Sequence, residues 1–113
     1  MKLIIAIIQP YRLEKVKTEL YKRDVNLITV TEVLGHGRQK GVEEVYRGNK
    51  ETGNLIRKVR LEIAVNEDFV DPTLEAILTG AKTGKTGDGK IFVLDLNECV
   101  RIRTGEKGQA AIG

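Results

Sequence analysis

The stretch LTGAKTGKTGDGKIFVLDL, residues 78–96, places a glycine- and lysine-rich segment between two apolar segments. Its residues 84–86 read GKT, the ending of a Walker A phosphate-binding loop. That loop has the pattern G-x-x-x-x-G-K-[ST] and stands between a strand and a following helix. Thr79 occupies the position of the first glycine of that pattern. The motif is therefore incomplete.

The segments on either side of this loop are also in the reverse order. Before it, apolar residues recur at the spacing of a helix face, namely Val70, Leu74, Ile77, Leu78 and Ala81. After it, residues 91–94 read IFVL, which is typical of a buried strand. A helix that precedes the loop cannot direct its N-terminal dipole at a phosphate group. The sequence therefore predicts helix, loop and strand, and excludes a Walker A loop.

The loop itself has two interpretations. Its glycines alternate with lysines: Gly84, Gly87 and Gly89 stand among Lys82, Lys85 and Lys90. Successive backbone N–H groups in such a turn can form a concave nest that binds anions without a helix. The alternative is a glycine-rich turn with solvated lysines and no ligand. The loop alone leaves both open.

Composition limits the class of protein. The chain has 113 residues, which suit one domain, and carries 31% charged residues with a net charge of +3. Aromatic residues make up 4%, too few for base stacking on nucleic acid. Cys99 is the single cysteine, so we expect no internal disulfide and a reducing cytoplasm. The apolar segment 3–8 is too short to insert into a membrane.

The residues that usually carry catalysis are scarce. The chain contains no serine, and His36 is its only histidine, without a ligand-spaced partner. Carboxylates are plentiful but occur singly on helix faces, as on a solvated surface. We therefore expect a binding protein rather than an enzyme.

Hydrophobic periodicity predicts an α+β fold of ferredoxin-like type. The expected order is a strand at 3–8, a helix from Pro10 to about 23, strands at 27–34 and 58–65, a helix from about 68, and strands at 91–96 and 100–103. The first four strands and two helices give β-α-β-β-α-β, an antiparallel sheet with both helices on one face.

Two of these strands, at 3–8 and 91–96, are apolar on both faces. Strands of this kind need both faces buried, and two helices can cover only one. We therefore expect the other face to pack against copies of the same chain in a closed homo-oligomer.

The connection between the second and third strands is the anomaly. Residues 35–56 read GHGRQKGVEEVYRGNKETGNLI, which is far longer than the roughly 2–5 residues of a hairpin loop. Its first part is a second cluster of glycines and cations. Two such clusters at the ends of the same sheet favour an anion site.

Three segments resemble the PII nitrogen-regulatory signal proteins: TEVLGHGRQKG at 31–41, TGKTGDGKIFV at 83–93 and VRIRTGEKGQAAI at 100–112. They match the entry to that family's T-loop, its B-loop and its C-loop. The resemblance covers residues 1–113 as one domain, with the T-loop at about 36–55, the B-loop at about 82–90 and the C-loop at about 101–110. It implies a homotrimer of ferredoxin-like subunits that binds ATP or ADP in the clefts between neighbours.

The resemblance also implies the nucleotide site. Gly87, Asp88, Gly89 and Lys90 would hold the phosphates, together with Arg38 and with Arg101 and Arg103 from the neighbouring subunit, which would share one side of the last strand. Thr29, Glu62 and Ala64 would lie near the base and sugar. The implied nucleotide residues are Thr29, Gly37, Arg38, Gln39, Glu62, Ala64, Gly87, Asp88, Gly89, Lys90, Arg101 and Arg103.

For 2-oxoglutarate, the resemblance implies Gln39, Lys40, Gly41 and Lys58. Gln39 would ligate Mg²⁺, which bridges the ATP phosphates and the keto acid, and Lys58 would pair with the distal carboxylate. Simpler interpretations remain. Arg101 and Arg103 could form an exposed strand face, and Lys58 with Glu62 could be a surface pair.

The implied function is control of an ammonium transporter or a nitrogen-assimilation enzyme by the T-loop, through Tyr46 and Arg47. The protein would be cytoplasmic and recruited to the membrane by the transporter. Glu51 stands where the family has its uridylylated tyrosine, and Asn49 where some relatives have a phosphorylated serine, so neither modification is expected. An alternative is a divergent sensor of an adenylyl nucleotide with bicarbonate. A nucleic-acid binder ranks last, since Phe92 is the only aromatic residue on the strands.

Overall fold

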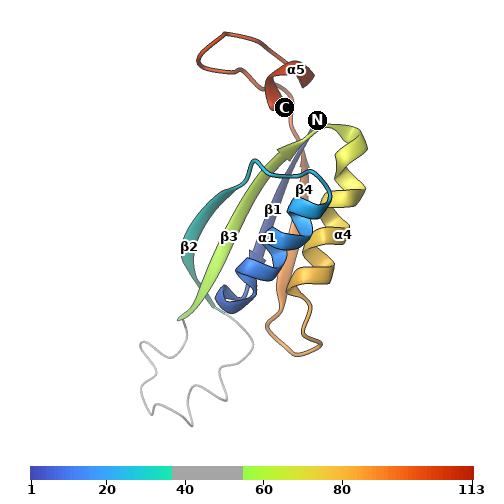
Figure 1. Ribbon diagram of the computed structural model, residues 1–113. Coiled ribbons are helices and arrows are strands. Elements are labelled where there is room, and N and C mark those ends of the chain that lie inside the picture. The colour runs from blue at the N-terminus through green and yellow to red at the C-terminus, as the bar shows by residue number, and fades with distance from the viewer. Residues whose placement is uncertain (37–54) are drawn as a thin grey trace.

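The computed structural model describes residues 1–36 and 55–113. Its elements follow the predicted order (Figure 1). They are β1 (Lys2–Ile8), the 3-10 turn η1 (Pro10–Arg12), α1 (Leu13–Lys22), β2 (Thr29–His36), β3 (Leu55–Val65), the 3-10 turn η2 (Glu67–Phe69), α4 (Val70–Ala81), β4 (Gly89–Asp95) and α5 (Gln109–Ile112). The ferredoxin-like β-α-β-β-α-β order is confirmed.

The four strands form one antiparallel sheet in the order β2-β3-β1-β4. On the central strand β1, Ile4 pairs with Ile63 of β3 on one side and with Val93 of β4 on the other. Figure 1 shows α1 and α4 on the same side of this sheet. The glycine turn connects the end of α4 to the start of β4, and both of these points lie beside β1.

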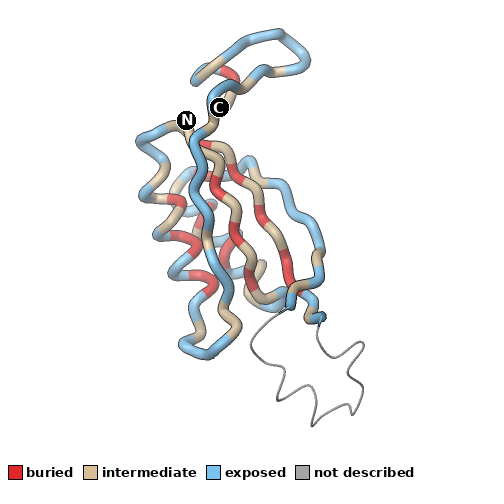
Figure 2. Tube along the Cα trace, turned by 180° about the vertical axis from the view of Figure 1, so that it is seen from behind, coloured by how far each residue is buried: buried red, intermediate tan, exposed pale blue. Residues whose placement is uncertain are grey.

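The core lies between the helices and one face of the sheet. Burial alternates along β1 at Ile4, Ala6 and Ile8, as Figure 2 shows from behind. It alternates in the same way along β3, because neighbouring side chains of a strand point to opposite faces. The helices contribute their apolar stripes to the same core. The buried members of β3, α1 and α4 are Val59, Leu61, Ile63, Val65, Val16, Leu20, Ala76, Ile77 and Ala81.

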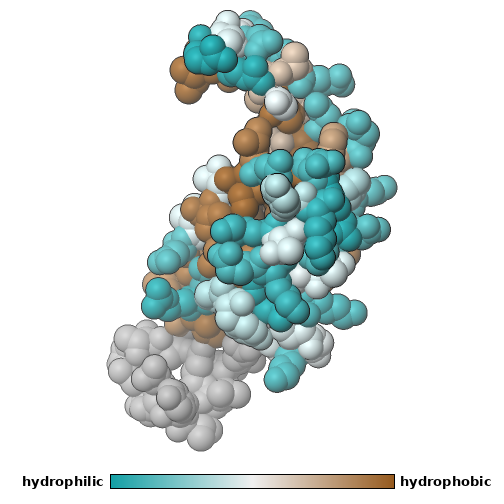
Figure 3. Space-filling model, in the orientation of Figure 1, coloured by the Kyte–Doolittle hydropathy of each residue, from teal (hydrophilic) through white to brown (hydrophobic). Residues whose placement is uncertain are grey.

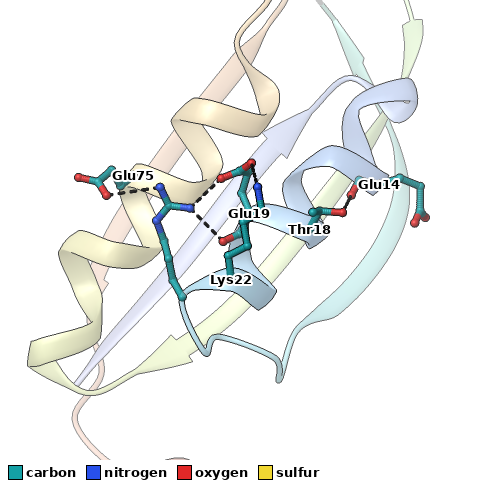
Figure 4. Close-up of polar contacts among 6 residues, drawn as sticks. Glu14, Thr18, Glu19, Lys22 and Glu75 are labelled. Carbon is teal, nitrogen blue, oxygen red and sulfur yellow. Dashed lines mark hydrogen bonds and ion pairs between the residues drawn. The ribbon is translucent and has the colours of Figure 1, made fainter.

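The two helices approach each other most closely at Gly80 and Val16. A Cβ atom on residue 80 would stand 2.7 Å from the Val16 Cα atom. Arg23 joins the helices further along (Figure 4), with Nη1 2.8 Å from Glu19 Oε1 and Nη2 3.4 Å from Glu75 Oε1. The helix pair is therefore fixed by close backbone packing and by an ion-pair network.

Over the opposite face of the sheet lies none of the helices in the described part of the chain. Phe92 and Leu94 lie on this face, which we call the uncovered face, and are 48% and 45% exposed. On the helix side, β2 lies beside the helices rather than beneath them (Figure 1), so Val30 and Leu34 are also exposed. Figure 3 shows apolar side chains at the surface on this side too. In one subunit, the apolar strands thus remain partly unburied.

The predicted fifth strand at 100–103 is wrong. Only an isolated bridge between Val100 and Lys107 forms there. Residues 102–104 form a turn instead, closed by a hydrogen bond of 2.7 Å from Gly105 N to the Arg101 carbonyl. Gly105 and Gly108 adopt positive φ angles, which bend the chain back before it can extend as a strand.

None of the helices in residues 1–36 and 55–113 has the length and hydropathy that crossing a lipid bilayer requires.

Candidate functional site

The glycine turn between α4 and β4, residues 82–88, is shaped by close contact with β1. Gly84 and Gly87 have positive φ angles, and so does Gly89, the first residue of β4. Gly89 is also packed against strand β1, since a Cβ atom there would stand 1.7 Å from the Ile7 carbonyl oxygen. Only glycine fits this position. The helix-turn-strand order that excludes a Walker A loop is confirmed.

The carboxylate of Asp88 holds the turn in shape. It accepts the Thr83 hydroxyl, the Thr83 N–H at 2.8 Å and the Gly84 N–H at 3.0 Å. These hydrogen bonds hold the pKa of Asp88 below its ordinary value, and the bond from the Thr83 hydroxyl has the largest effect on that pKa. The Asp88 side chain thus serves the turn itself, which leaves the lysines and backbone groups to face a ligand.

Lys58 is buried beneath the turn. It is 8% exposed, and its Nζ atom donates to the Gly87 carbonyl oxygen at 2.9 Å. The same oxygen accepts the side-chain amide of Gln9 at 2.8 Å. Glu62 pairs instead with Arg60, at 2.7 Å. The interpretation of Lys58 and Glu62 as a surface pair is therefore wrong.

A groove of about 520 Å³ opens beside these residues. Its lining consists of Ile7, Gly35, His36, Lys58, Lys85, Thr86, Gly87, Asp88, Gly89, Lys90 and Phe92. Three lysines share it with one carboxylate, that of Asp88, which is already hydrogen-bonded by the turn. Lys58 has no carboxylate partner among the described residues. The groove therefore has the charge that an anionic ligand requires.

The predicted base and sugar residues lie along the same face of the sheet. Thr29 pairs with Glu62, and Lys58, Glu62 and Ala64 occupy alternate positions of β3. Their face is the uncovered one, because the positions between them are in the core. From Lys58 to Ala64 the strand rises about 20 Å. The predicted phosphate and base residues of one chain thus form a continuous track.

Arg101 and Arg103 lie at the other end of the subunit. The turn at 82–88 and the C-terminal segment project from opposite ends of β4 (Figure 1), about 20 Å apart along that strand. The Arg101 guanidinium is bound within its own segment, to Glu106 and to the Ala110 carbonyl at 3.1 Å. Because no strand forms there, the prediction that both arginines share one strand side is wrong. A single chain does not bring them to the groove.

Several predicted residues lie outside the described part of the chain. They are Gly37, Arg38, Gln39, Lys40, Gly41, Tyr46, Arg47, Asn49 and Glu51. The expected Mg²⁺ ligand is among them. His36 pairs with Leu55 at the end of the β2–β3 ladder, and Gly35 and His36 line the groove. The end of β2 therefore lies beside the groove.

Sequence reasoning did not single out Gln9. The available signal was its position, since it is the polar residue directly after a strand of seven, at Lys2–Ile8. Because β1 pairs with β4, the end of β1 must lie beside the turn that enters β4. A polar side chain placed there can reach the backbone of the turn.

Comparison with known proteins identifies the class to which this fold and site belong. The family model described as "Nitrogen regulatory protein P-II" matches residues 1–106. The chain therefore belongs to the nitrogen regulatory P-II family, and the resemblance in the sequence is confirmed. Proteins of this family are regulatory signal transducers.

Individual relatives agree with this assignment. Nitrogen regulatory protein GlnK1 of Methanosarcina mazei is 53% identical over 114 residues, covering 99% of this chain and 97% of that protein. Nitrogen regulatory protein P-II 1 of Escherichia coli K12 is 49% identical over 112 residues, covering 99% and 100%. A crystal structure of Arabidopsis thaliana PII bound to citrate has a TM-score of 0.80 and 34% identity, covering 98% of this chain and 88% of that one.

Proposed function

We propose that this protein reports the nitrogen, carbon and energy status of the cell. It binds ATP or ADP in the groove and, together with Mg²⁺ and ATP, 2-oxoglutarate. Through its T-loop, residues 36–55, it regulates an ammonium transporter or a nitrogen-assimilation enzyme in the cytoplasm. One observation carries this proposal: within residues 1–36 and 55–113, Lys58 is buried without a carboxylate partner and meets a tight glycine turn on a sheet face that no helix covers.

The nucleotide phosphates are bound by the turn. Backbone N–H groups at 87–89 and the Lys90 ammonium face them, while Asp88 keeps the turn in shape. Thr29, Glu62 and Ala64 receive the sugar and base along the uncovered face. Gly37 and Arg38 add to the site from the T-loop.

The site is completed by a neighbouring subunit. Arg101 and Arg103 cannot reach the groove of their own chain, because the sheet separates them from it. In a homotrimer, they would approach the groove of the next subunit, and guanidinium groups suit phosphate oxygens. The exposure of Phe92 and Leu94 in one chain, at 48% and 45%, supports this assembly, because contact between subunits would bury these apolar side chains.

The keto acid binds beside the phosphates. Lys58 pairs with its distal carboxylate, and Lys40 and Gly41 lie on the T-loop side. Gln39 would hold Mg²⁺, which supplies positive charge between the phosphates and the keto acid. The citrate in the Arabidopsis thaliana relative is a carboxylate ligand, in keeping with this chemistry.

Calorimetric titration tests the proposal. We expect 2-oxoglutarate to give no heat with the protein alone and saturable heat with Mg²⁺-ATP present. Lys58→Met should remove the second signal and leave ADP binding within about twofold, while the control Lys22→Met, on an exposed part of α1, should change neither. Equal binding of 2-oxoglutarate without nucleotide, or equal loss of both ligands in Lys58→Met, would contradict it.

The partner is tested by co-purification. The bound nucleotide and keto acid set the conformation of the T-loop, whose Tyr46 and Arg47 contact the target. We expect target capture from cell extract under Mg²⁺-ATP to change on addition of 2-oxoglutarate. Capture that is the same in both conditions would show that the ligand does not control the T-loop.

A further inference from the structure

The Gly87 carbonyl oxygen accepts hydrogen bonds from two side chains, one just beyond β1 and one on β3. The side-chain amide of Gln9, just beyond β1, reaches it at 2.8 Å, and the ammonium of Lys58, on β3, at 2.9 Å. Both bonds are partly shielded from water. Because the two donors share one acceptor, the amide and the ammonium are close neighbours at Gly87, and of the two donors Lys58 lines the groove.

The two donors differ in what else they can bind. Lys58 carries a charge, is 8% exposed and has no carboxylate partner in the described part of the chain. A ligand carboxylate would attract it far more strongly than a neutral carbonyl does. Gln9 is neutral, so a ligand carboxylate attracts its amide much less strongly than it attracts the Lys58 ammonium. The hydrogen bond from Gln9 to Gly87 can therefore remain when the ligand binds.

We propose that Gln9 is the positioning residue that holds the phosphate turn at Gly87 when Lys58 turns to the carboxylate of a ligand. This inference rests on the proposed function, in which Lys58 binds the keto acid. Without Gln9, each transfer of Lys58 to a ligand leaves the Gly87 carbonyl unbonded in the groove. A partly buried acceptor that loses its donors is costly, so the Gln9 amide lowers the cost of binding the second ligand beside the first.

The consequence is a specific division of effects. Loss of the Gln9 amide should weaken binding of the keto acid, because Lys58 leaves Gly87 when that ligand binds. It should hardly change the affinity for nucleotide alone, because Lys58 then still donates to Gly87. A residue that merely supported the fold would weaken both ligands together. The ratio of the two affinities therefore separates a positioning role from a structural one.

Three variants make the calorimetric test. Gln9→Met keeps the length of the side chain and removes its hydrogen-bond donor. We expect it to bind 2-oxoglutarate about tenfold more weakly than the wild type in the presence of Mg²⁺-ATP, and to bind ADP within about twofold of the wild-type affinity. Gln9→Glu places a carboxylate beside Lys58 and should weaken the keto acid further. The matched control Gln109→Met, at an exposed position at the start of α5, should change neither affinity. Equal loss of ADP and 2-oxoglutarate in Gln9→Met, or no loss of either, would overturn the inference.

A double-mutant cycle tests the shared acceptor without any ligand. Thermal midpoints of Gln9→Met, Lys58→Met and the double variant are compared at one protein concentration. We expect the double variant to lose more than the two single losses combined, because only it leaves the Gly87 carbonyl without a donor. Additive losses would overturn the two-donor arrangement. If the unmodified protein binds no 2-oxoglutarate in the presence of Mg²⁺-ATP, both the proposed function and the role of Gln9 are refuted. If the unmodified protein binds 2-oxoglutarate and Gln9→Met binds it equally well, only the role of Gln9 is refuted.

Discussion

Gly89 lies against Ile7 so closely that a Cβ atom on residue 89 would stand 1.7 Å from the Ile7 carbonyl oxygen. This contact joins the glycine turn to the central strand of the sheet, with residue 89 at a φ angle of 107°. Strand β1 thus sets the position of the backbone groups at 87–90, which the proposed function assigns to the phosphates. The C-terminal end of the turn is consequently anchored to the central strand of the sheet.

Gly89→Ala should destabilise the protein by about 3 kcal/mol, since it adds a backbone clash to an unfavourable φ angle. Urea unfolding measures this loss. Gly105→Ala is the matched control, because its φ of 74° is also positive and no atom stands within 4 Å of the added Cβ. We expect about 1 kcal/mol for the control. Equal losses would mean that the contact with Ile7 relaxes freely.

Gly80→Ala tests the helix contact. Alanine favours a helix by about 1 kcal/mol over glycine, so propensity alone predicts a gain. We expect a net loss of about 2 kcal/mol instead, because the new methyl group would meet the backbone of Val16 at 2.7 Å. Thr79→Ala, on the exposed side of α4, should stay within about 0.5 kcal/mol of wild type. A stabilised Gly80→Ala variant would refute the close packing of α1 and α4.

The stability contributed by Asp88 should depend on pH. Its pKa is lower in the folded protein than the ordinary 3.8, owing to hydrogen bonds from Thr83 and Gly84. A lowered folded pKa stabilises the protein above the unfolded pKa, and this stability is lost as the pH falls toward the folded pKa. Thermal midpoints of wild type and Asp88→Asn should therefore differ at neutral pH and converge in acid. A difference that stays constant down to acid pH would contradict this role.

The periodic elements of the fold could be predicted from the sequence, because a two-layer core imposes its period on the chain. Leu13, Val16 and Leu20 recur as a helix stripe, and β3 alternates apolar and polar residues from 59 to 65. The prediction of a fifth strand at 100–103 was wrong because that segment is too short to show a clear period. Four residues with alternating valine, isoleucine and arginine are too few to outweigh the glycine turns at 105 and 108.

The candidate site was only partly predictable. The glycine spacing pointed to the turn, and the family resemblance supplied residue roles. The burial of Lys58 could not be inferred from its own surroundings in the sequence, because it depends on Gly87, which is distant along the chain. Gln9 was missed although its position directly after β1 places it beside the turn that enters β4. The roles of 37–54, including Gln39 and Tyr46, stay predictions, since these residues lie outside the described ranges.

Assembly is the central claim, because the uncovered face and the distance between the turn and Arg103 both require a second copy to complete the site. Leu94→Asp places a charge on that face, at a residue that does not line the groove, and should release monomers that bind no nucleotide. Leu78→Asp is the control, since Leu78 is also exposed, at 58%, but lies on α4. It should assemble and bind as the wild type does.

Native mass spectrometry of the purified protein with ATP tests this claim most directly. The account predicts three chains that carry up to three nucleotides, with no nucleotide on separated subunits. A monomer that retains ATP, or a Leu94→Asp variant that binds ATP as a single chain, would contradict it.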